Sequence, residues 1–574
     1  MKNKEIAQIF SQIADILEIN DENPFRIRAY QNAARIVEGL PEEVEKIEQR
    51  GGIGEISGIG AGIADRISEL VRTNRLSYYE ELKAKTPEGL VRMLDIPDLG
   101  PKTVALLKQK LGIENIEQLE KAAREGILRN LPGMGEKTEE NILSGIEFLK
   151  YHRERILLGK AYPLSQSIII LLNKISSVKR ISAAGSLRRM RETIGDIDIL
   201  ATSEEPQQVM KVFTGMPSVT SVLAMGETKS SVYIEENIQI DLRVVAEESF
   251  GAALQYFTGS KSHNIKLREL AHKRGLKINE YGVFRISGER IGGREEDDIY
   301  KVLALHYIPP ELREGLGEIE AAQQGRGLPE LITHEKVRGD FHVHSNWSDG
   351  ANSIPELAAA ARRLGYEYLA ICDHSKSLGI AGGLSEERLR KQIKEIKALN
   401  KSFSNFQILC GTEVDIDSDG ELDFSDDLLS ELDIVIAAIH TGFKQEGSRI
   451  TERIISAMEN KFVNIIAHPT GRLLGEREGY ELDMERLIGE AKRTGTALEL
   501  NALPQRLDLS DVHCHMAGSA GVLIALGTDA HNAAQLEVMQ YGVATARRGW
   551  LEEKNVINTL SLSKLLKKLN NGKT

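Results

Sequence analysis

The stretch RGDFHVHSNWSDG, residues 338–350, places His342 and His344 one residue apart in an apolar run, and the turn Asp349-Gly350 follows closely. Side chains two positions apart in a β-strand point to the same face, so this run predicts a strand that presents both imidazoles together. Eight of the 13 histidines lie after residue 340. The function of the C-terminal part therefore depends on what these histidines bind.

The region from 337 to 574 alternates short apolar runs with helical patterns. Such βα repetition favours a parallel sheet or a barrel. Polar residues stand at or just past the ends of the apolar runs, and they are His342, His344, His374, Glu413, His440, His468, Asp529 and His531. The C-terminal strand ends of a βα barrel converge on one mouth, so these residues are expected to meet in space.

Imidazole and carboxylate groups together suit Zn²⁺, Mn²⁺ or Fe. A single histidine at a strand end is usually structural, but several histidines that obey the same rule favour a metal site. His513 and His515 lie on a predicted helix and are expected to be ordinary surface or core histidines.

The order H-x-H, D-H, E, H, H, D-x-H over about 337–570 resembles the PHP (polymerase and histidinol phosphatase) domain. The resemblance implies a distorted (β/α)7 barrel that hydrolyses phosphoesters with up to three Mn²⁺, Zn²⁺ or Fe ions. The implied metal ligands are His342, His344, Asp349, His374, Glu413, His440, His468, Asp529 and His531. Cys372 departs from the threonine that often precedes Asp-His, and Arg472 and Arg506 are candidate phosphate contacts.

A second cluster is predicted in AAGSLRRMRETIGDIDILA, residues 183–201. Asp196 and Asp198 share one face of a strand-like run, and Asp241 lies in a later one. An isolated pair of this kind is usually a solvated edge strand. The upstream Gly185-Ser186 turn and the later Asp241 favour a site for hard divalent cations such as Mg²⁺, with a phosphate at the turn.

The stretches YFTGSKSHN at 256–264 and LKINEYGVF at 276–284 complete a resemblance, from about residue 5 to 316, to the family X DNA polymerases. The resemblance implies that Asp196, Asp198 and Asp241 bind the catalytic Mg²⁺ or Mn²⁺ ions. The implied nucleotide contacts are Gly185, Ser186 and Arg189 at the triphosphate, Tyr256, Phe257 and Gly259 at the sugar, and Asn264 at the base. Lys261 departs from the acidic residue that some relatives carry.

Three glycine-containing turns, each followed by a helix start, recur within residues 1–150 as SGIGAGIADRI (57–67), IPDLGPKTVALL (96–107) and LPGMGEKTEENIL (131–143). One copy alone would indicate a helix corner without a ligand, but three favour binding of the DNA backbone through helix N-terminal amides. The turns resemble helix-hairpin-helix motifs, although Asp98 replaces a glycine. The predicted DNA contacts are Gly58, Gly60, Gly62, Arg66, Gly100, Lys102, Gly133, Gly135, Lys137, Arg26 and Tyr30.

Composition sets the remaining limits. The net charge of −12 requires any DNA contact to use local basic patches or backbone amides. Three cysteines without a CxxC pair disfavour a disulfide framework and fit a reducing cytoplasm. No apolar run of about 18 residues appears, so no membrane span is expected.

A length of 574 residues predicts several domains, of mixed α+β and α/β class. The predicted order is a lyase-like helix-hairpin-helix domain that binds DNA ends (1–85), a fingers-like helix-hairpin-helix domain (86–150), a nucleotidyltransferase palm (151–246), a thumb (247–316), a linker (317–336) and a PHP phosphoesterase domain (337–574).

The predicted function is a monomeric DNA-directed DNA polymerase of bacterial or archaeal type. We expect it to bind gapped or nicked DNA with a 5′-phosphate, to use dNTPs in filling short gaps during base excision repair, and to act as a 3′-5′ exonuclease through the PHP domain. The sequence leaves open an abasic-site endonuclease or 3′-phosphatase activity. The alternatives are a small-molecule phosphatase of the histidinol-phosphate type with an accessory DNA-binding front half, and a DNA-end scaffold with inactive sites.

Overall fold

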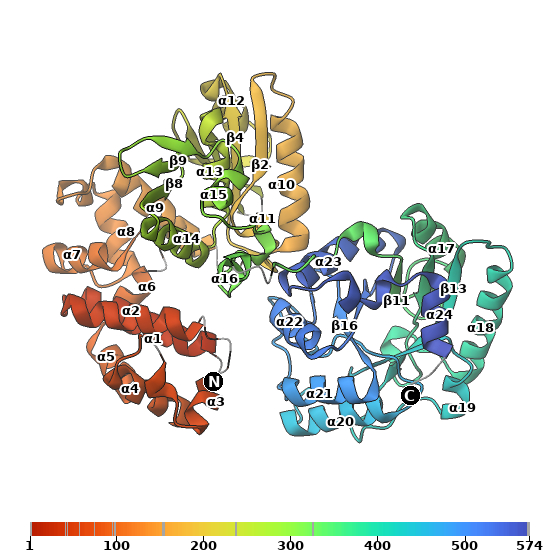
Figure 1. Cartoon of the computed structure of the whole chain (residues 1–574). Coiled ribbons are helices and arrows are strands. Elements are labelled where there is room, and N and C mark those ends of the chain that lie inside the picture. Colours follow the sequence, from red (N-terminus) through yellow and green to blue (C-terminus); the bar gives the residue numbers. More distant parts are fainter. Residues whose placement is uncertain are drawn as a thin grey trace. The chain divides into compact units, whose positions relative to one another are not determined.

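The computed structural model describes residues 3–570 except 39, 41, 43, 57, 74, 95, 97, 98, 152–154, 236, 237 and 324–326. Figure 1 labels helices and strands of the chain. The chain divides into two compact units. The first comprises Met1–Glu154 with the segments Ser218–Ala224 and Val232–Asn237, and the second comprises the remaining residues. Asp98, which departs from the turn pattern, lies outside the described residues.

Residues 3–151 are helical over most of their described part. The helices are α1 (Asn3–Ile19), α2 (Pro24–Glu38), α3 (Val44–Gln49), α4 (Ala61–Thr73), α5 (Ser77–Lys85), α6 (Glu88–Met93), α7 (Pro101–Leu111), α8 (Ile116–Arg124) and α9 (Glu136–Tyr151). Apolar residues at helical spacing, such as Phe10, Ile13 and Leu17, give α1 a buried face. One apolar core lies among α1–α5 and another among α6–α9.

A five-stranded sheet in the order β2-β4-β7-β6-β5 forms the centre of the predicted palm. Its strands are β2 (Val178–Ala183), β4 (Ile197–Ser203), β5 (Val219–Met225), β6 (Lys229–Ile234) and β7 (Ile238–Val245). Strands β4 and β7 run parallel, with Asp198 directly opposite Asp241. Helices α10 (Leu158–Leu172) and α12 (Pro206–Thr214) contact this sheet.

The predicted thumb contains α13 (Phe250–Thr258), α14 (Lys261–Lys273), α15 (Glu296–Val302) and the small sheet β8 (Leu276–Asn279), β9 (Gly282–Arg285) and β10 (Arg290–Gly292). The fully buried Arg313 donates to the Glu296 carboxylate at 2.6 Å. Arg188, at the end of the short helix α11 (Gly185–Arg188), contacts the same carboxylate at 2.6 and 2.7 Å. This ion cluster fixes the palm turn against α15.

Each apolar run noted in the C-terminal region contains one strand. The strands are β11 (Gly339–Val343), β12 (Tyr368–Ile371), β13 (Gln407–Asp415), β14 (Ile434–Ala438), β15 (Ile465–Ile466), β16 (Ala497–Asn501) and β17 (Ile524–Gly527). They follow one another in sequence order, all parallel. A bridge between Val343 and Ala530 brings the first and last strands together, so the predicted seven-stranded barrel is confirmed as nearly closed.

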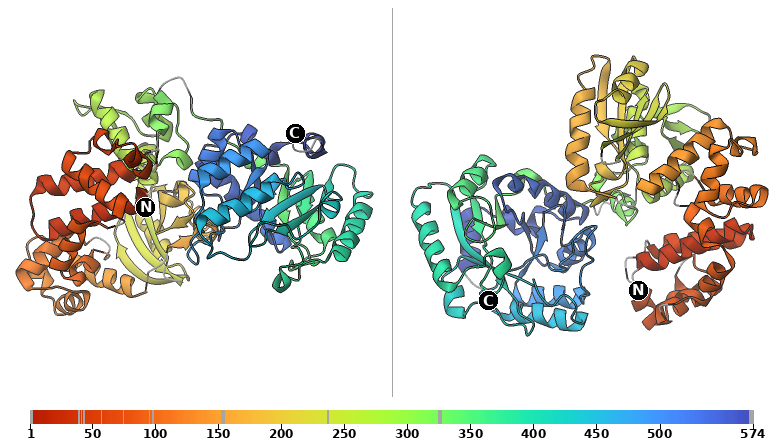
Figure 2. Two further views of the ribbon diagram at one scale, coloured as in Figure 1. Left: turned by 90° about the horizontal axis from the view of Figure 1, so that it is seen from below. Right: turned by 180° about the vertical axis from the view of Figure 1, so that it is seen from behind.

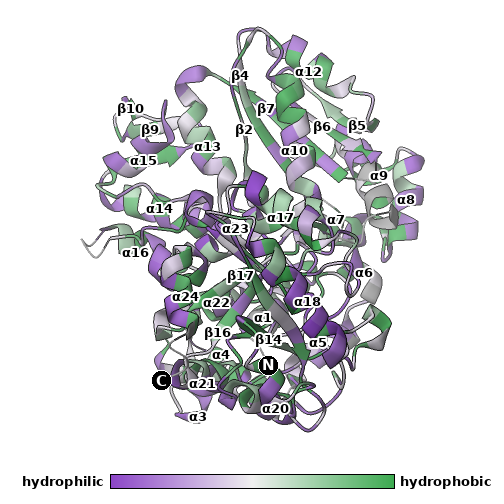
Figure 3. Ribbon diagram, turned by 90° about the vertical axis from the view of Figure 1, so that its right-hand side faces the viewer, coloured by the Kyte–Doolittle hydropathy of each residue, from purple (hydrophilic) through white to green (hydrophobic). Residues whose placement is uncertain are grey.

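Helices surround these strands in the green-to-blue part of Figure 2. They are α17 (Ile354–Arg363), α18 (Glu386–Asn400), α19 (Asp426–Leu429), α20 (Gly447–Glu459), α21 (Met484–Thr494), α22 (Asp511–Ala520), α23 (Met539–Arg548) and α24 (Leu562–Asn570). Helix α18 is largely hydrophilic, yet it buries Leu389, Ile393 and Ile396 on one face (Figure 3). In the described part of the chain, no helix combines the length and apolar character needed to cross a bilayer.

We predict that Gly339→Ala destabilises the PHP barrel. A Cβ at Gly339 would lie 2.2 Å from Cδ2 of Tyr368 and 2.4 Å from its backbone oxygen, so the strand pair β11–β12 has to shift. Such overpacking costs about 1–3 kcal/mol. Both tryptophans, Trp347 and Trp550, lie in the barrel region, so urea unfolding followed by tryptophan fluorescence reports this region alone. An unchanged midpoint would contradict the close packing at β11.

Candidate active sites

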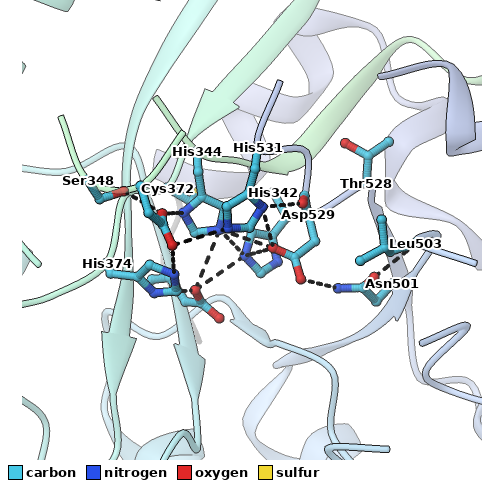
Figure 4. Close-up of polar contacts among 12 residues, drawn as sticks. His342, His344, Ser348, Cys372, His374, Asn501, Leu503, Thr528, Asp529 and His531 are labelled. Atoms are coloured by element: carbon cyan, nitrogen blue, oxygen red, sulfur yellow. Dashed lines mark hydrogen bonds and ion pairs between the residues drawn. The ribbon is translucent and has the colours of Figure 1, made fainter. Parts of the chain in front are cut away.

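The barrel brings its predicted ligands together at the C-terminal ends of the strands (Figure 4). His342 lies in β11 and Glu413 in β13, while the other members follow the ends of β11, β12, β14, β15 and β17. Glu413 is central: one carboxylate oxygen lies 2.8 Å from Nδ1 of His374, and the other lies 2.9 Å from Nε2 of His468 and 3.4 Å from Nε2 of His440.

Three groups of residues within this cluster could each hold a cation, because the ligand atoms of each group all lie within 4.8 Å of one another. The groups are His344, Asp349, His374 and His531; His342, His344 and Asp529; and His374, Glu413 and His440. His468 joins them through Glu413. The structure thus gathers all nine residues that the PHP resemblance implied, and their role as metal ligands stays a prediction.

The donor set fits a metal cluster. The Nε2 atoms of His342 and His344 face each other at 3.1 Å, and Nε2 of His344 lies 3.1 Å from a carboxylate oxygen of Asp529. In the described part of the chain, Nδ1 of His344 and of His468 are buried without a hydrogen-bond partner. Buried polar atoms normally have partners, and a bound cation would provide them here.

The charges of the cluster are strongly coupled. Burial lowers the pKa of His374, but Glu413 and Asp349 more than offset this effect and raise it to about 10. The pKa of His440 is raised to about 9, because burial is again outweighed by Glu413 and Asp415. Without a cation the carboxylates therefore hold these imidazoles protonated, and cation binding has to displace protons.

Buried carboxylates outside the predicted set support the imidazoles. Glu499, in β16, accepts from Nδ1 of His342 at 2.7 Å, and Asp415 contacts Nδ1 of His440 at 3.0 Å. A hydrogen bond on one ring nitrogen fixes which nitrogen faces the cluster. Sequence reasoning did not select these residues, although a charged residue inside an apolar strand run was the available signal.

The two predicted phosphate contacts have different places. Nε of Arg506 lies 3.3 Å from a carboxylate oxygen of Asp529, so this guanidinium borders the cluster. Arg472 instead forms an ion pair with Glu192 of the palm at 2.6 Å. The prediction for Arg472 as a direct phosphate contact is thereby disfavoured, because its donors are already occupied.

In the palm, β4 and β7 place Asp198 beside Asp241, and Asp196 immediately precedes β4. Burial, Asp196 and Asp241 together raise the pKa of Asp198 to about 7. Among the described residues this triad does not form a group with all ligand atoms within 4.8 Å. Asp241 instead contacts the Lys229 ammonium at 3.3 Å and accepts from the Gln239 side-chain amide at 3.0 Å.

The palm turn requires a glycine because the Asp198 carboxylate lies against its backbone. Gly185 has φ +61°, and a Cβ there would lie 2.3 Å from a carboxylate oxygen of Asp198. Ser186 follows in the first turn of α11. The turn thus lies directly against the carboxylates, as a triphosphate site beside bound cations requires.

The remaining predicted nucleotide contacts are held by hydrogen bonds within the protein. Arg189 donates to the backbone oxygen of Thr258 at 2.5 Å and contacts Glu314 at 3.1 Å. Asn264 donates to the backbone oxygen of Tyr256 at 2.7 Å. Phe257 packs edge-on against Tyr256, and Gly259 ends α13 with φ +68°. Arg189 and Asn264 are therefore both fixed by hydrogen bonds to backbone oxygens of α13.

Each of the three N-terminal turns ends on a glycine at a helix start. Gly60, Gly100 and Gly135 stand immediately before α4, α7 and α9, and a Cβ at any of the three would have open space within 4 Å. The left-handed residues are Gly58, with φ +88°, and Gly133, with φ +78°. The absence of side chains at the helix starts leaves the outward amides accessible to a phosphate.

The side chains around the first turn form a stacked cluster. The Arg66 guanidinium lies 4.5 Å from the Tyr78 ring centroid and 5.7 Å from that of Tyr30, and it donates to the Gly62 oxygen at 3.0 Å. Arg26 donates to the Tyr78 hydroxyl at 2.6 Å. Tyr30 itself is buried, so it can support Arg66 but offers little surface for direct DNA contact. Lys102 and Lys137 are exposed.

Comparison with known protein families identifies four regions of the chain. A helix-hairpin-helix domain matches residues 1–76, a SAM-like helix-hairpin-helix tandem 90–147, the DNA polymerase beta thumb 253–314 and the PHP domain 340–502. A polymerase thumb and a PHP domain on one chain define a polymerase-type protein with an attached metal-dependent phosphoesterase fold.

The chain is 43% identical over 565 residues to the DNA polymerase/3'-5' exonuclease PolX of Bacillus subtilis (strain 168), covering 98% of both proteins. It is 30% identical over 231 residues to a probable phosphatase of Thermoanaerobacter sp. (strain X514), covering 38% of this chain and 89% of that protein. The chain belongs to the family X DNA polymerases that carry a C-terminal PHP domain.

The raised pKa of Asp198 predicts a pH-dependent cation requirement at the palm. Below about pH 7 the cation-free carboxyl is protonated, so cation binding has to release this proton. The Mg²⁺ concentration for half-maximal gap filling should therefore fall by up to about tenfold between pH 6 and 7, then level off. A titration at each pH, with substrate saturating, measures this; a flat profile would contradict the assigned shift.

The open space at Gly135 predicts a selective loss of DNA affinity. Gly135→Val should leave the turn folded, because Gly133 carries the left-handed conformation, but the side chain would block a phosphate. We expect about a tenfold loss for gapped DNA, the scale of one charge-assisted hydrogen bond, and a smaller loss for Lys137→Ala. Gly489→Val, equally unobstructed but on the barrel helix α21, is the matched control. A larger loss from Lys137→Ala would favour side-chain charge over backbone amides.

Proposed function

We propose that this chain is a DNA-directed DNA polymerase that fills short gaps in repair and removes 3′ nucleotides through its PHP domain. The observation that carries the proposal is that two separate clusters of ionisable groups, three carboxylates in the palm and an imidazole-rich set in the barrel, occur on a single chain. The near full-length similarity to a protein named as polymerase and 3'-5' exonuclease supports it.

The residues of each cluster have distinct tasks in this proposal. Asp196, Asp198 and Asp241 would hold Mg²⁺ or Mn²⁺, and the nine barrel residues would hold Mn²⁺, Zn²⁺ or Fe. Bound divalent metals supply Lewis-acid stabilisation of phosphate charge and activate the attacking oxygen. The Gly185-Ser186 turn would seat the triphosphate, with Arg189 as its charge-assisted contact.

In the barrel, the chain's own groups orient the site. Glu499 holds Nδ1 of His342, so Nε2 of that ring faces the cluster. The Arg506 guanidinium presents planar donors beside Asp529. We infer that it binds a phosphate oxygen of the strand being cut.

The proposed DNA substrate is a gap or nick with a 5′-phosphate, bound by the helix-hairpin-helix turns through backbone amides. Arg66, fixed between Tyr30 and Tyr78, would pair with the 5′-phosphate. The chain would act as a monomer in the cytoplasm, on repair intermediates. The predicted domain boundaries are part of the same proposal.

A small-molecule phosphatase is the second candidate, because two probable phosphatases match 38% and 39% of the chain. A phosphatase function leaves the thumb and the palm carboxylates without a task. Release of phosphate from histidinol phosphate at a rate exceeding nucleotide release from DNA would favour this alternative.

We predict that the two activities separate by mutation. The double variant His342→Ala/His344→Ala should retain gap filling and lose at least about 100-fold in exonuclease rate. Loss of a residue that only hydrogen-bonds a metal ligand lowers activity about 10–100-fold, and loss of a ligand itself should cost more. Asp196→Ala/Asp198→Ala should show the reverse. A gapped duplex with a labelled 3′ end, with and without dNTPs, reports both; loss of both activities from either folded variant would refute two independent sites.

A further inference from the structure

The loop between β16 and α22, residues 502–509, carries Arg506 to the barrel cluster. The Arg506 side chain is 18% exposed, and its Nε lies 3.3 Å from Asp529. In the described part of the chain this Nε is buried without a hydrogen-bond partner. Apart from this ion pair, the position of the guanidinium therefore depends on how the loop backbone is held.

Arg472 holds that backbone. Its Nε donates to the carbonyl oxygen of Arg506 at 3.0 Å, and its Nη2 also donates to the carbonyl of Leu507. The same guanidinium contacts the Glu192 carboxylate at 2.6 and 3.2 Å. Arg472 thus bridges the loop of the phosphoesterase site and a residue of the polymerase palm, 280 positions away along the chain.

A second palm residue contacts the same loop. Gly159, in the first turn of α10, faces Pro504 so closely that a Cβ would lie 2.4 Å from the proline Cγ. The two palm residues are adjacent, because the backbone N–H of Leu158 donates to the carbonyl of Glu192 at 3.0 Å. Two independent contacts, one ionic and one steric, therefore define where the loop lies.

We propose that Glu192 and Gly159 of the palm are positioning residues for the phosphoesterase site. Through Arg472 and Pro504 they fix the loop so that Arg506 meets the phosphate of the strand being cut. The inference rests on the proposed exonuclease function of the barrel. It makes the polymerase palm a structural part of the second active site.

A general docking contact between domains is the competing explanation, and the chain offers a matched control. Arg547 on α23 contacts Glu311 of the thumb at 2.7 Å, and among the described residues this pair has no contact with the loop. Glu311→Gln thus weakens a second ion pair between the polymerase region and the barrel while leaving residues 502–509 undisturbed. Glu192→Gln and Gly159→Ala are the test variants, and alanine suits the helical site of Gly159.

The first measurement is single-strand exonuclease kinetics with Mn²⁺, with gap filling as the parallel assay. A displacement of about 1 Å of a group that positions the substrate can lower the rate up to about 100-fold. We therefore expect kcat/KM for the exonuclease to be at least about tenfold lower in Glu192→Gln and Gly159→Ala. KM should carry much of the change, since Arg506 binds phosphate. Gap filling, and both activities of Glu311→Gln, should stay within about twofold of wild type.

A double-mutant cycle separates positioning from loss of folding. If Glu192 acts through Arg506, adding Glu192→Gln to Arg506→Ala should cause less than about twofold further loss. Trypsin gives a readout without metal: in EDTA, cleavage after Arg506 should be faster in both test variants than in wild type or Glu311→Gln. Mapping the fragments by mass spectrometry locates the cut.

The inference would be overturned if Glu192→Gln and Gly159→Ala kept the exonuclease rate of the wild type. It would also be overturned if Glu311→Gln lost as much exonuclease activity as they do, or if the effects of Glu192→Gln and Arg506→Ala were fully additive. As long as the wild-type chain is an active exonuclease in the same assay, these outcomes refute the positioning role and leave the proposed function of the barrel intact. Absence of exonuclease from the wild-type chain would instead refute the proposed function of the barrel, and the inference with it.

Discussion

The need to neutralise charges that lie close together is the constraint on which both sites depend. In the palm, burial and repulsion from Asp196 and Asp241 raise the pKa of Asp198 to about 7. In the barrel the Glu413 carboxylate lies among several imidazoles and keeps His374 and His440 protonated. Removing charged groups from water costs several kcal/mol per charge, so the fold has to supply neutralising partners. In the proposed function a bound cation would complete that neutralisation in each site.

The two sites meet this constraint with different donors. The palm offers carboxylates on two adjacent parallel strands, an arrangement suited to hard cations with oxygen ligands. The barrel offers imidazoles from several strand ends, which suit softer transition metals. Buried acids such as Glu499 and Asp415 fix the imidazoles by hydrogen bonds to the nitrogen that faces away from the cluster.

Sequence periodicity predicted much of this architecture. The alternation of apolar runs and helical patterns indicated the barrel, and the position of polar residues after those runs indicated which side chains would meet. Other features were missed because they depend on partners far along the chain. Arg472 has the sequence context of a phosphate contact, yet its guanidinium is bound by Glu192. Tyr30 lies on the helix face expected to contact DNA, yet it is buried among aromatic neighbours.

The sequence by itself determined the elements and the chemistry they carry, because strand and helix periods and the glycines of tight turns act over a few residues. It determined that Asp198 and Asp241 are strand residues, and that His342 and His344 lie at the end of one strand. The tertiary structure alone decided which donors are occupied and which side chain fixes the Arg506 backbone, because those contacts join residues 34 and 280 positions apart. Pairing over such separations depends on packing of whole domains, which no local pattern encodes.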